Sequence, residues 1–225
     1  MSMELLTTFH LLTLIVSAFL CRFPFLNFPL DDDFAIYTYR ARFAKKGFLW
    51  KDDLQIIGIP MWKMMLFDKL FASSDKGHLR IRHLQTLFHA AACLAIYWVV
   101  LVITQNQWAA LTGGLLYSFY GTSPDLTAGS FNFEQFYIPF IFAGLAFLLN
   151  GEVFYAGLCF GFAVIGKCTM IIYGGVLTPI VWISYGETPA LIFVIATSVV
   201  ILLSNSIEWA LGFWDAQSIK QTKTR

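Results

Sequence analysis

The chain has 225 residues, of which 58% are hydrophobic and 13% are charged. With a mean hydropathy of +0.67, this composition excludes a soluble globular protein and predicts an all-α polytopic membrane protein. The formal net charge of +1 says little about partners, and we expect no nucleic acid among them.

Charged side chains are concentrated in one part of the chain. Residues 22–85 contain 18 of the 29 charges, 11 basic and 7 acidic, whereas Lys167 is the one basic residue in 86–219. The sequence therefore predicts a single polar segment set into an otherwise lipid-embedded chain.

The first predicted element is a membrane helix over residues 5–21. Its 17 uncharged residues are at the lower limit of the roughly 17 to 25 that span a bilayer. Glu4 precedes it, with no Lys or Arg and no small-residue cleavage site, so we interpret the segment as a retained anchor and not a signal peptide.

The second predicted element is a long membrane-surface loop over residues 22–83. Its charges alternate with bulky apolar groups, and helical spacing predicts interfacial amphipathic helices over 34–46 and 61–72. Three consecutive aspartates, Asp31 to Asp33, stand where the first of these helices would begin.

Six further membrane segments are predicted after this loop, followed by a polar tail over 205–225. Several of the apolar runs are short for a full crossing, which favours tilted or partly re-entrant helices. We therefore predict one transmembrane domain over residues 1–225 with about seven spans, of which spans two to seven occupy 84–204: 84–104, 108–120, 133–149, 153–166, 168–185 and 190–204.

The three aspartates have two interpretations. As a helix cap, one or two of them would stabilise the following helix. As neighbouring carboxylates, they repel one another, which favours protonation of one member and suits a general base.

Glu134 and Lys167 are further candidates, and by span counting both lie on the side of the aspartates. Glu134 is either an interfacial carboxylate at a helix start or a second acidic group of the same site. Lys167 is either a lysine that reaches the interface or a phosphate ligand. Arg80 and Arg82 form a second cationic pair where the loop re-enters the membrane, suited to phosphate.

Taken together, these residues resemble a known family. The first part of the pattern is Pro29-Leu30-Asp31-Asp32-Asp33, Tyr39-Arg40-Ala41, Gly47, Trp50-Lys51-Asp52 and Pro60. The second part is Glu134 with Pro139, Tyr155-Ala156-Gly157-Leu158, Gly161-Phe162-Ala163 and Gly166-Lys167. This pattern is similar to that of GT-C fold glycosyltransferases, which use polyprenyl-phosphate sugar donors. The resemblance covers roughly residues 25–179, and order and spacing carry it more than any single residue.

The resemblance implies roles for individual residues. Asp32 or Asp33, with Asp31 as a third choice, would be the general base or position the acceptor, and Glu134 would be the second acidic residue. Lys167 would hold the donor phosphate, with Arg82 and Arg80 as further cations. A divalent metal held by Asp32, Asp33 and Glu134 is an option that no motif supports.

The resemblance also implies a topology, with the N-terminus in the cytoplasm and the long loop outside, most simply in a bacterial inner membrane. The 11 Lys and Arg of the loop argue for the opposite side, but the positive-inside rule is weak for a segment of this length.

The alternative function is a non-catalytic membrane subunit derived from this fold, and a second membrane polypeptide that completes the fold is a further expected partner.

Overall fold

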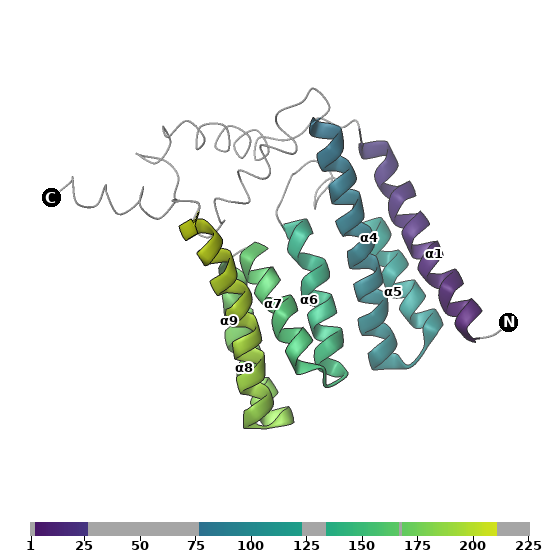
Figure 1. Cartoon of the computed structure of the whole chain (residues 1–225). Coiled ribbons are helices and arrows are strands. Elements are labelled where there is room, and N and C mark those ends of the chain that lie inside the picture. Colours follow the sequence, from purple (N-terminus) through teal and green to yellow (C-terminus); the bar gives the residue numbers. More distant parts are fainter. Residues whose placement is uncertain (1–2, 27–76, 123–133, 167, 211–225) are drawn as a thin grey trace, which may run out of the picture.

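The computed structural model describes residues 3–26, 77–122, 134–166 and 168–210 (Figure 1). Within these ranges the chain is helical and contains no strand. The α-helices, in chain order, are α1 (Met3–Arg22), α4 (Gly77–Thr104), α5 (Gln107–Tyr120), α6 (Glu134–Leu149), α7 (Val153–Gly166), α8 (Ile171–Tyr185) and α9 (Glu187–Ala210), with 3-10 turns η1 (Phe23–Phe25) and η4 (Cys168–Met170).

Three helical segments are long and apolar enough to cross a membrane: Glu4–Phe25, Leu79–Thr104 and Glu187–Ile207. The other four helices have 14 to 16 residues, so each is about 21 to 24 Å long, against a hydrocarbon core of about 30 Å. By length and composition, three of the described helices are candidate spans, and the seven-span topology stays a prediction.

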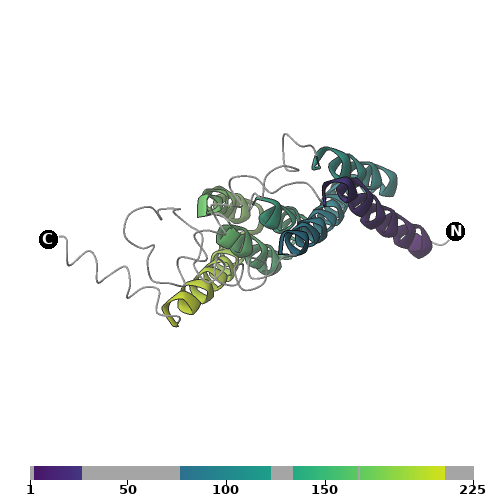
Figure 2. The ribbon, with the colours of Figure 1, turned by 90° about the horizontal axis from the view of Figure 1, so that it is seen from above.

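The helices form an elongated array and not a closed bundle, as the view from above shows (Figure 2). Helices α1, α4 and α5 pack against one another, and α4 also packs against α6. From there the packing continues from α6 to α7, from α7 to α9 and from α9 to α8. Each of the two halves has its own apolar core: Leu14, Cys93 and Ala110 belong to the first, and Phe160, Val181 and Phe193 to the second.

Successive helices run in opposite directions, so their ends collect at two levels (Figure 1). We call the level at which α1 ends at Arg22, α4 begins at Gly77 and α6 begins at Glu134 the upper end. The lower end contains the turn between α4 and α5, where the side chain of Asn106 accepts hydrogen bonds from the backbone N–H groups of Trp108 and Ala109.

The outer faces of the array are apolar. Ile172, Trp182 and Ile183 of α8 and Leu202 of α9 are among the large side chains that are more than half exposed. Because water-exposed apolar surface of this extent is unfavourable, these faces fit contact with lipid tails.

Two helix boundaries differ from the sequence prediction by six residues or more. Helix α4 begins at Gly77, before the predicted start of the span at residue 84, and α9 continues to Ala210, past the predicted end at 204. An apolar run marks only the part of a helix that is hydrophobic, so added turns that carry polar residues are missed. In α4 the added part carries Arg82, which is buried.

Candidate functional site

A stripe of polar side chains runs down one face of the upper half of α4. Arg82, Gln85, Thr86 and His89 follow the i, i+3, i+4, i+7 spacing that places residues on one side of a helix. Each is at most 2% exposed, and the four lie on a helix that from Leu79 onward is apolar enough to cross a membrane. Such groups are costly to bury in a membrane helix, so this stripe is the first candidate for function.

Arg22 adds a second buried guanidinium, from the last residue of α1. It is 3% exposed, and its Nη2 donates to the carbonyl oxygen of Gly121 at the end of α5, at 3.4 Å. Arg22 and Arg82 are close enough for their positive charges to repel each other. A negative charge beside two positive charges that are buried away from water would stabilise them.

The side chain of Gln85 carries a buried hydrogen-bond donor without an acceptor. Nη1 of Arg82 donates to Oε1 of Gln85 at 3.1 Å, which uses the acceptor of the amide. The amide Nε2 of the same side chain, on a fully buried residue, has no hydrogen-bond partner. An arginine has donors and no acceptor. We call Arg22, Arg82 and Gln85 the donor cluster, in which Nε2 of Gln85 is a buried donor that an acceptor would satisfy.

His89 closes the lower side of the donor cluster. Its Nε2 lies 3.2 Å from the backbone oxygen of Ser118, and because a carbonyl can only accept, Nε2 carries the proton and donates. The ring also stacks on Tyr117, with centroids 5.3 Å apart. A Cβ at Gly121 would lie 2.9 Å from His89 Cε1, so glycine is what allows α5 to end against this ring.

The structure places Glu134 and leaves four predicted residues outside its range. Asp31, Asp32, Asp33 and Lys167 lie outside the described residues. Glu134 is the first residue of α6, and its backbone lies at the upper end.

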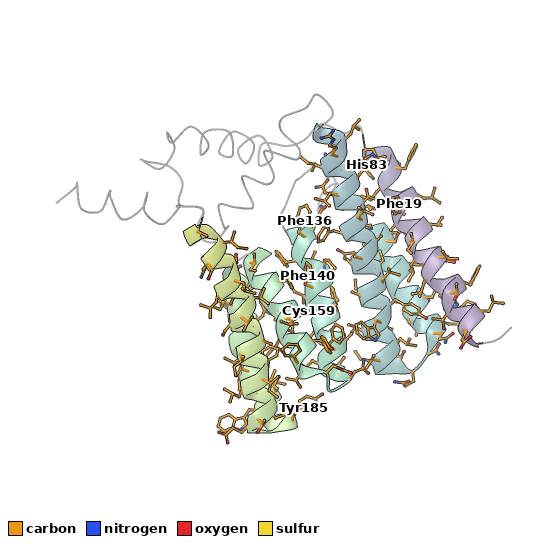
Figure 3. The ribbon with its side chains drawn as sticks, viewed as in Figure 1. Phe19, His83, Phe136, Phe140, Cys159 and Tyr185 are labelled. Carbon is orange, nitrogen blue, oxygen red and sulfur yellow. The ribbon has the colours of Figure 1, made fainter. Side chains whose placement is uncertain are left out.

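Aromatic contacts join the start of α6 to the upper half of α4. Phe88 of α4 and Phe136 of α6 make an edge-to-face contact with centroids 4.8 Å apart. Figure 3 shows Phe136 in the upper half of the array, below His83, and Tyr185 near the lower end. The backbone of Glu134, two residues before Phe136, is thereby held at the level of the donor cluster.

Arg80 and Arg82 do not form the predicted pair. Two residues apart on a helix, they point about 200° away from each other, and Arg80 is exposed while Arg82 is buried. The guanidinium that accompanies Arg82 comes instead from Arg22, which the sequence prediction placed at the start of the loop over residues 22–83. The signal that could have found the donor cluster is the polar stripe of α4, whose lower residues lie inside an apolar run.

Among the residues that the structure describes, no group of three or more His, Cys, Asp or Glu side chains could hold a metal ion. Of the metal set considered from the sequence, Asp32 and Asp33 lie outside these residues, so that option stays untested.

Comparison with known proteins gave no match to a family model, to a curated protein or to a solved structure. The fold and the site define an all-helical protein with helices of membrane-spanning length and a buried cationic cluster at one end. The likeness to GT-C glycosyltransferases rests on the sequence pattern alone.

Proposed function

We propose that this protein is an integral-membrane glycosyltransferase of GT-C type, or its N-terminal module, which moves a sugar from a polyprenyl-phosphate donor to an acceptor hydroxyl. The observation that carries the proposal is the donor cluster, in which Arg22, Arg82 and the amide of Gln85 meet at one end of helices otherwise suited to lipid. A phosphate would bring the oxygen acceptors and the negative charge that this cluster favours.

The buried amide of Gln85 favours a ligand that carries a hydrogen-bond acceptor. A buried amide N–H without a partner costs roughly 1 to 3 kcal/mol, and the Nε2 of Gln85 is such a group. One phosphate oxygen bound to Nε2 would remove that cost. The same phosphate would reduce the repulsion between Arg22 and Arg82.

The transfer step then needs a base and a leaving group. In the proposed reaction Asp32 or Asp33 takes the proton of the acceptor hydroxyl, and the hydroxyl oxygen attacks the anomeric carbon of the donor sugar. The bond from that carbon to the phosphate oxygen breaks, and polyprenyl phosphate leaves with the bonding electrons. Glu134 and Lys167 would orient acceptor and donor phosphate, respectively.

The proposal places the upper end outside a bacterial inner membrane and the N-terminus in the cytoplasm. Two exposed positions test this orientation in a variant without native cysteines: Phe23→Cys near the upper end and Glu152→Cys in the lower turn between α6 and α7. An impermeant thiol reagent should label the first from outside the cell and the second only after permeabilisation. The reverse pattern would place the site in the cytoplasm.

Donor binding is tested by replacing both hydrogen-bonded side chains of the cluster at once. The double variant Arg82→Met with Gln85→Leu removes the charge and the amide together, so neither member of this hydrogen-bonded pair is left without the other. The matched control is His83→Leu on the exposed side of the same helix turn. We expect the double variant to bind a polyprenyl-phosphate sugar at least tenfold more weakly and the control to bind it like the parent.

Equal affinity of all three proteins would remove the donor cluster from the proposal. Polyprenyl phosphate that copurifies with the parent, identified by mass spectrometry, would support it directly. A chain that binds the donor but transfers sugar only with a second polypeptide would assign it to the alternative, a subunit or half of a split enzyme.

A further inference from the structure

Two thiols from different helices interact with one buried hydroxyl. Ser118 of α5 is fully buried, and its Oγ donates a hydrogen bond to Sγ of Cys21, near the end of α1, at 3.6 Å. The same hydroxyl interacts with the thiol of Cys93 in α4, and the thiols of Cys93 and Cys21 are close enough to influence each other electrostatically. We call Cys21, Cys93 and Ser118 the thiol cluster.

The helices pack closely around the thiol cluster. A Cβ at Gly114, one turn before Ser118, would lie 3.1 Å from the backbone oxygen of Cys93, so α5 and α4 approach each other tightly at this level. Cys93 also belongs to the same apolar core as Ala18, which lies three residues before Cys21 on α1. Small side chains allow such close contacts between helices. Both cysteines are therefore held where three helices meet.

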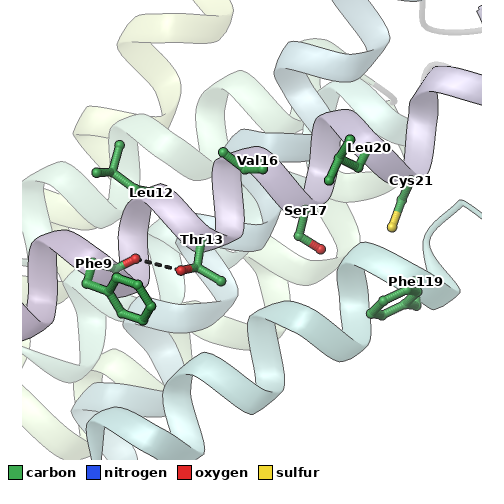
Figure 4. A pocket seen from close by; sticks show the side chains of 8 residues that line it. All are labelled: Phe9, Leu12, Thr13, Val16, Ser17, Leu20, Cys21 and Phe119. Carbon is green, nitrogen blue, oxygen red and sulfur yellow. Dashed lines mark hydrogen bonds between the residues drawn. The ribbon is translucent and has the colours of Figure 1, made fainter.

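The two thiols differ in their access from outside the protein. Both are free in this structure. Cys93 is fully buried, whereas Cys21 is partly exposed and lines an apolar groove to which side chains of α1 and α5 contribute (Figure 4). A small apolar reagent can therefore meet Cys21 directly, and the route to Cys93 passes through Cys21.

We infer that Cys21 and Cys93 are a disulfide-forming pair that links α1 to α4 by exchange with an external disulfide. In the first step, the sulfur of Cys21 gives up its proton and attacks one sulfur of that disulfide, and the other half leaves and takes up a proton as a thiol. In the second step, the sulfur of Cys93 attacks Sγ of Cys21, and the second thiol leaves. Two cysteine thiols are thereby oxidised, and one external disulfide is reduced to two thiols.

The new bond would replace the contacts that both sulfurs make with Ser118. Rotation about the Cα–Cβ bond moves each sulfur between three staggered positions, which allows the two to turn from the shared hydroxyl towards each other. Neither cysteine has a role in the proposed sugar transfer, so the pair can be tested independently of that proposal.

The test uses an external disulfide whose products can be counted. The full-length protein, with Cys159 and Cys168 replaced by alanine, is purified in detergent and treated with 4,4′-dithiodipyridine, which releases one thiopyridone at each exchange. We expect two thiopyridones per chain, no pyridyl group left on the protein, and a peptide map in which the peptides of Cys21 and Cys93 stay joined until dithiothreitol is added.

Single variants in the same background test the order of the two steps. Cys93→Ala should release one thiopyridone and keep a pyridyl group on Cys21. Cys21→Ala should leave Cys93 unreacted until denaturant unfolds the protein. The matched control keeps Cys21 and Cys159 as its two thiols, on helices α1 and α7 of different halves of the array, and each should keep its own pyridyl group.

Two further results would overturn the inference. One is a protein in which Cys21 and Cys93 each keep a pyridyl group or become linked only in denaturant. The other is a disulfide between two chains, visible as a dimer on a non-reducing gel. The linked protein should also unfold at a higher denaturant concentration than the same sample after dithiothreitol, because the link restricts the unfolded chain.

Discussion

Adding a single methyl group where α7 crosses α9 should destabilise the protein. Gly157 and Gly161 of α7 are spaced by four residues, the pattern that lets membrane helices approach closely. A Cβ at Gly157 would lie 2.6 Å from the backbone oxygen of Phe193 and 2.8 Å from the Cβ of Ala196. Ordinary contacts of a Cβ begin at 3.4 Å, so Gly157→Ala would require the helices to separate by about 0.8 Å.

The expected cost combines three effects. Overpacking of a tight contact costs about 1 to 3 kcal/mol. Separation of the helices would also strain the 3.0 Å hydrogen bond from Thr197 Oγ1 to the backbone oxygen of Gly157, which contributes about 0.5 to 1.5 kcal/mol. The higher helix propensity of alanine offsets about 0.8 to 1.0 kcal/mol. We expect Gly157→Ala to lower the free energy of unfolding by about 1 to 3 kcal/mol.

Gly174 provides the matched control, because a Cβ there would meet nothing within 4 Å. Gly174→Ala on α8 should therefore keep only the propensity gain and raise stability by up to about 1 kcal/mol. Unfolding in detergent, followed by tryptophan fluorescence against denaturant, measures both variants. If Gly157→Ala is as stable as Gly174→Ala, the close contact between α7 and α9 at Gly157 is contradicted.

Three further predictions concern a cap and the residues assigned from the sequence. Asn106→Ala should cost about 0.5 to 2 kcal/mol in the same unfolding assay, because two backbone N–H groups of α5 lose their acceptor, and Asn106→Asp should not. Among single Asn variants of Asp31, Asp32 and Asp33, one should lose about 10² to 10⁴-fold in the rate of sugar transfer with unchanged stability; three fully active variants would leave only a capping role. Lys167→Met should lower donor affinity without loss of stability, and full affinity would favour a lysine that merely reaches the interface.

The order and type of the helices could be predicted from the sequence. Long apolar runs at 5–21, 84–104 and 190–204 correspond to the three helices long enough to cross a membrane, because a membrane helix must keep almost every side chain apolar over its length. The gaps left between predicted spans at 105–107 and 150–152 coincide with the turns that join α4 to α5 and α6 to α7.

The donor cluster could not be predicted in the same way. The sequence prediction placed Arg22 and Arg82 at opposite ends of the loop over 22–83, 60 residues apart in the sequence. The packing of α1 against α4 brings the two guanidiniums together. Because α4 extends to Gly77, Arg82 lies on its buried face while Arg80 lies on its exposed face.

The amino-acid sequence by itself determined that this is a helical protein with membrane-spanning segments, since that follows from the length of its apolar runs. The tertiary structure decided which polar residues meet, because a buried charge is placed by the contacts of neighbouring helices and not by its own segment. It also decided that side chains of α1 and α5 line one groove, since a groove exists only where the two helices lie side by side.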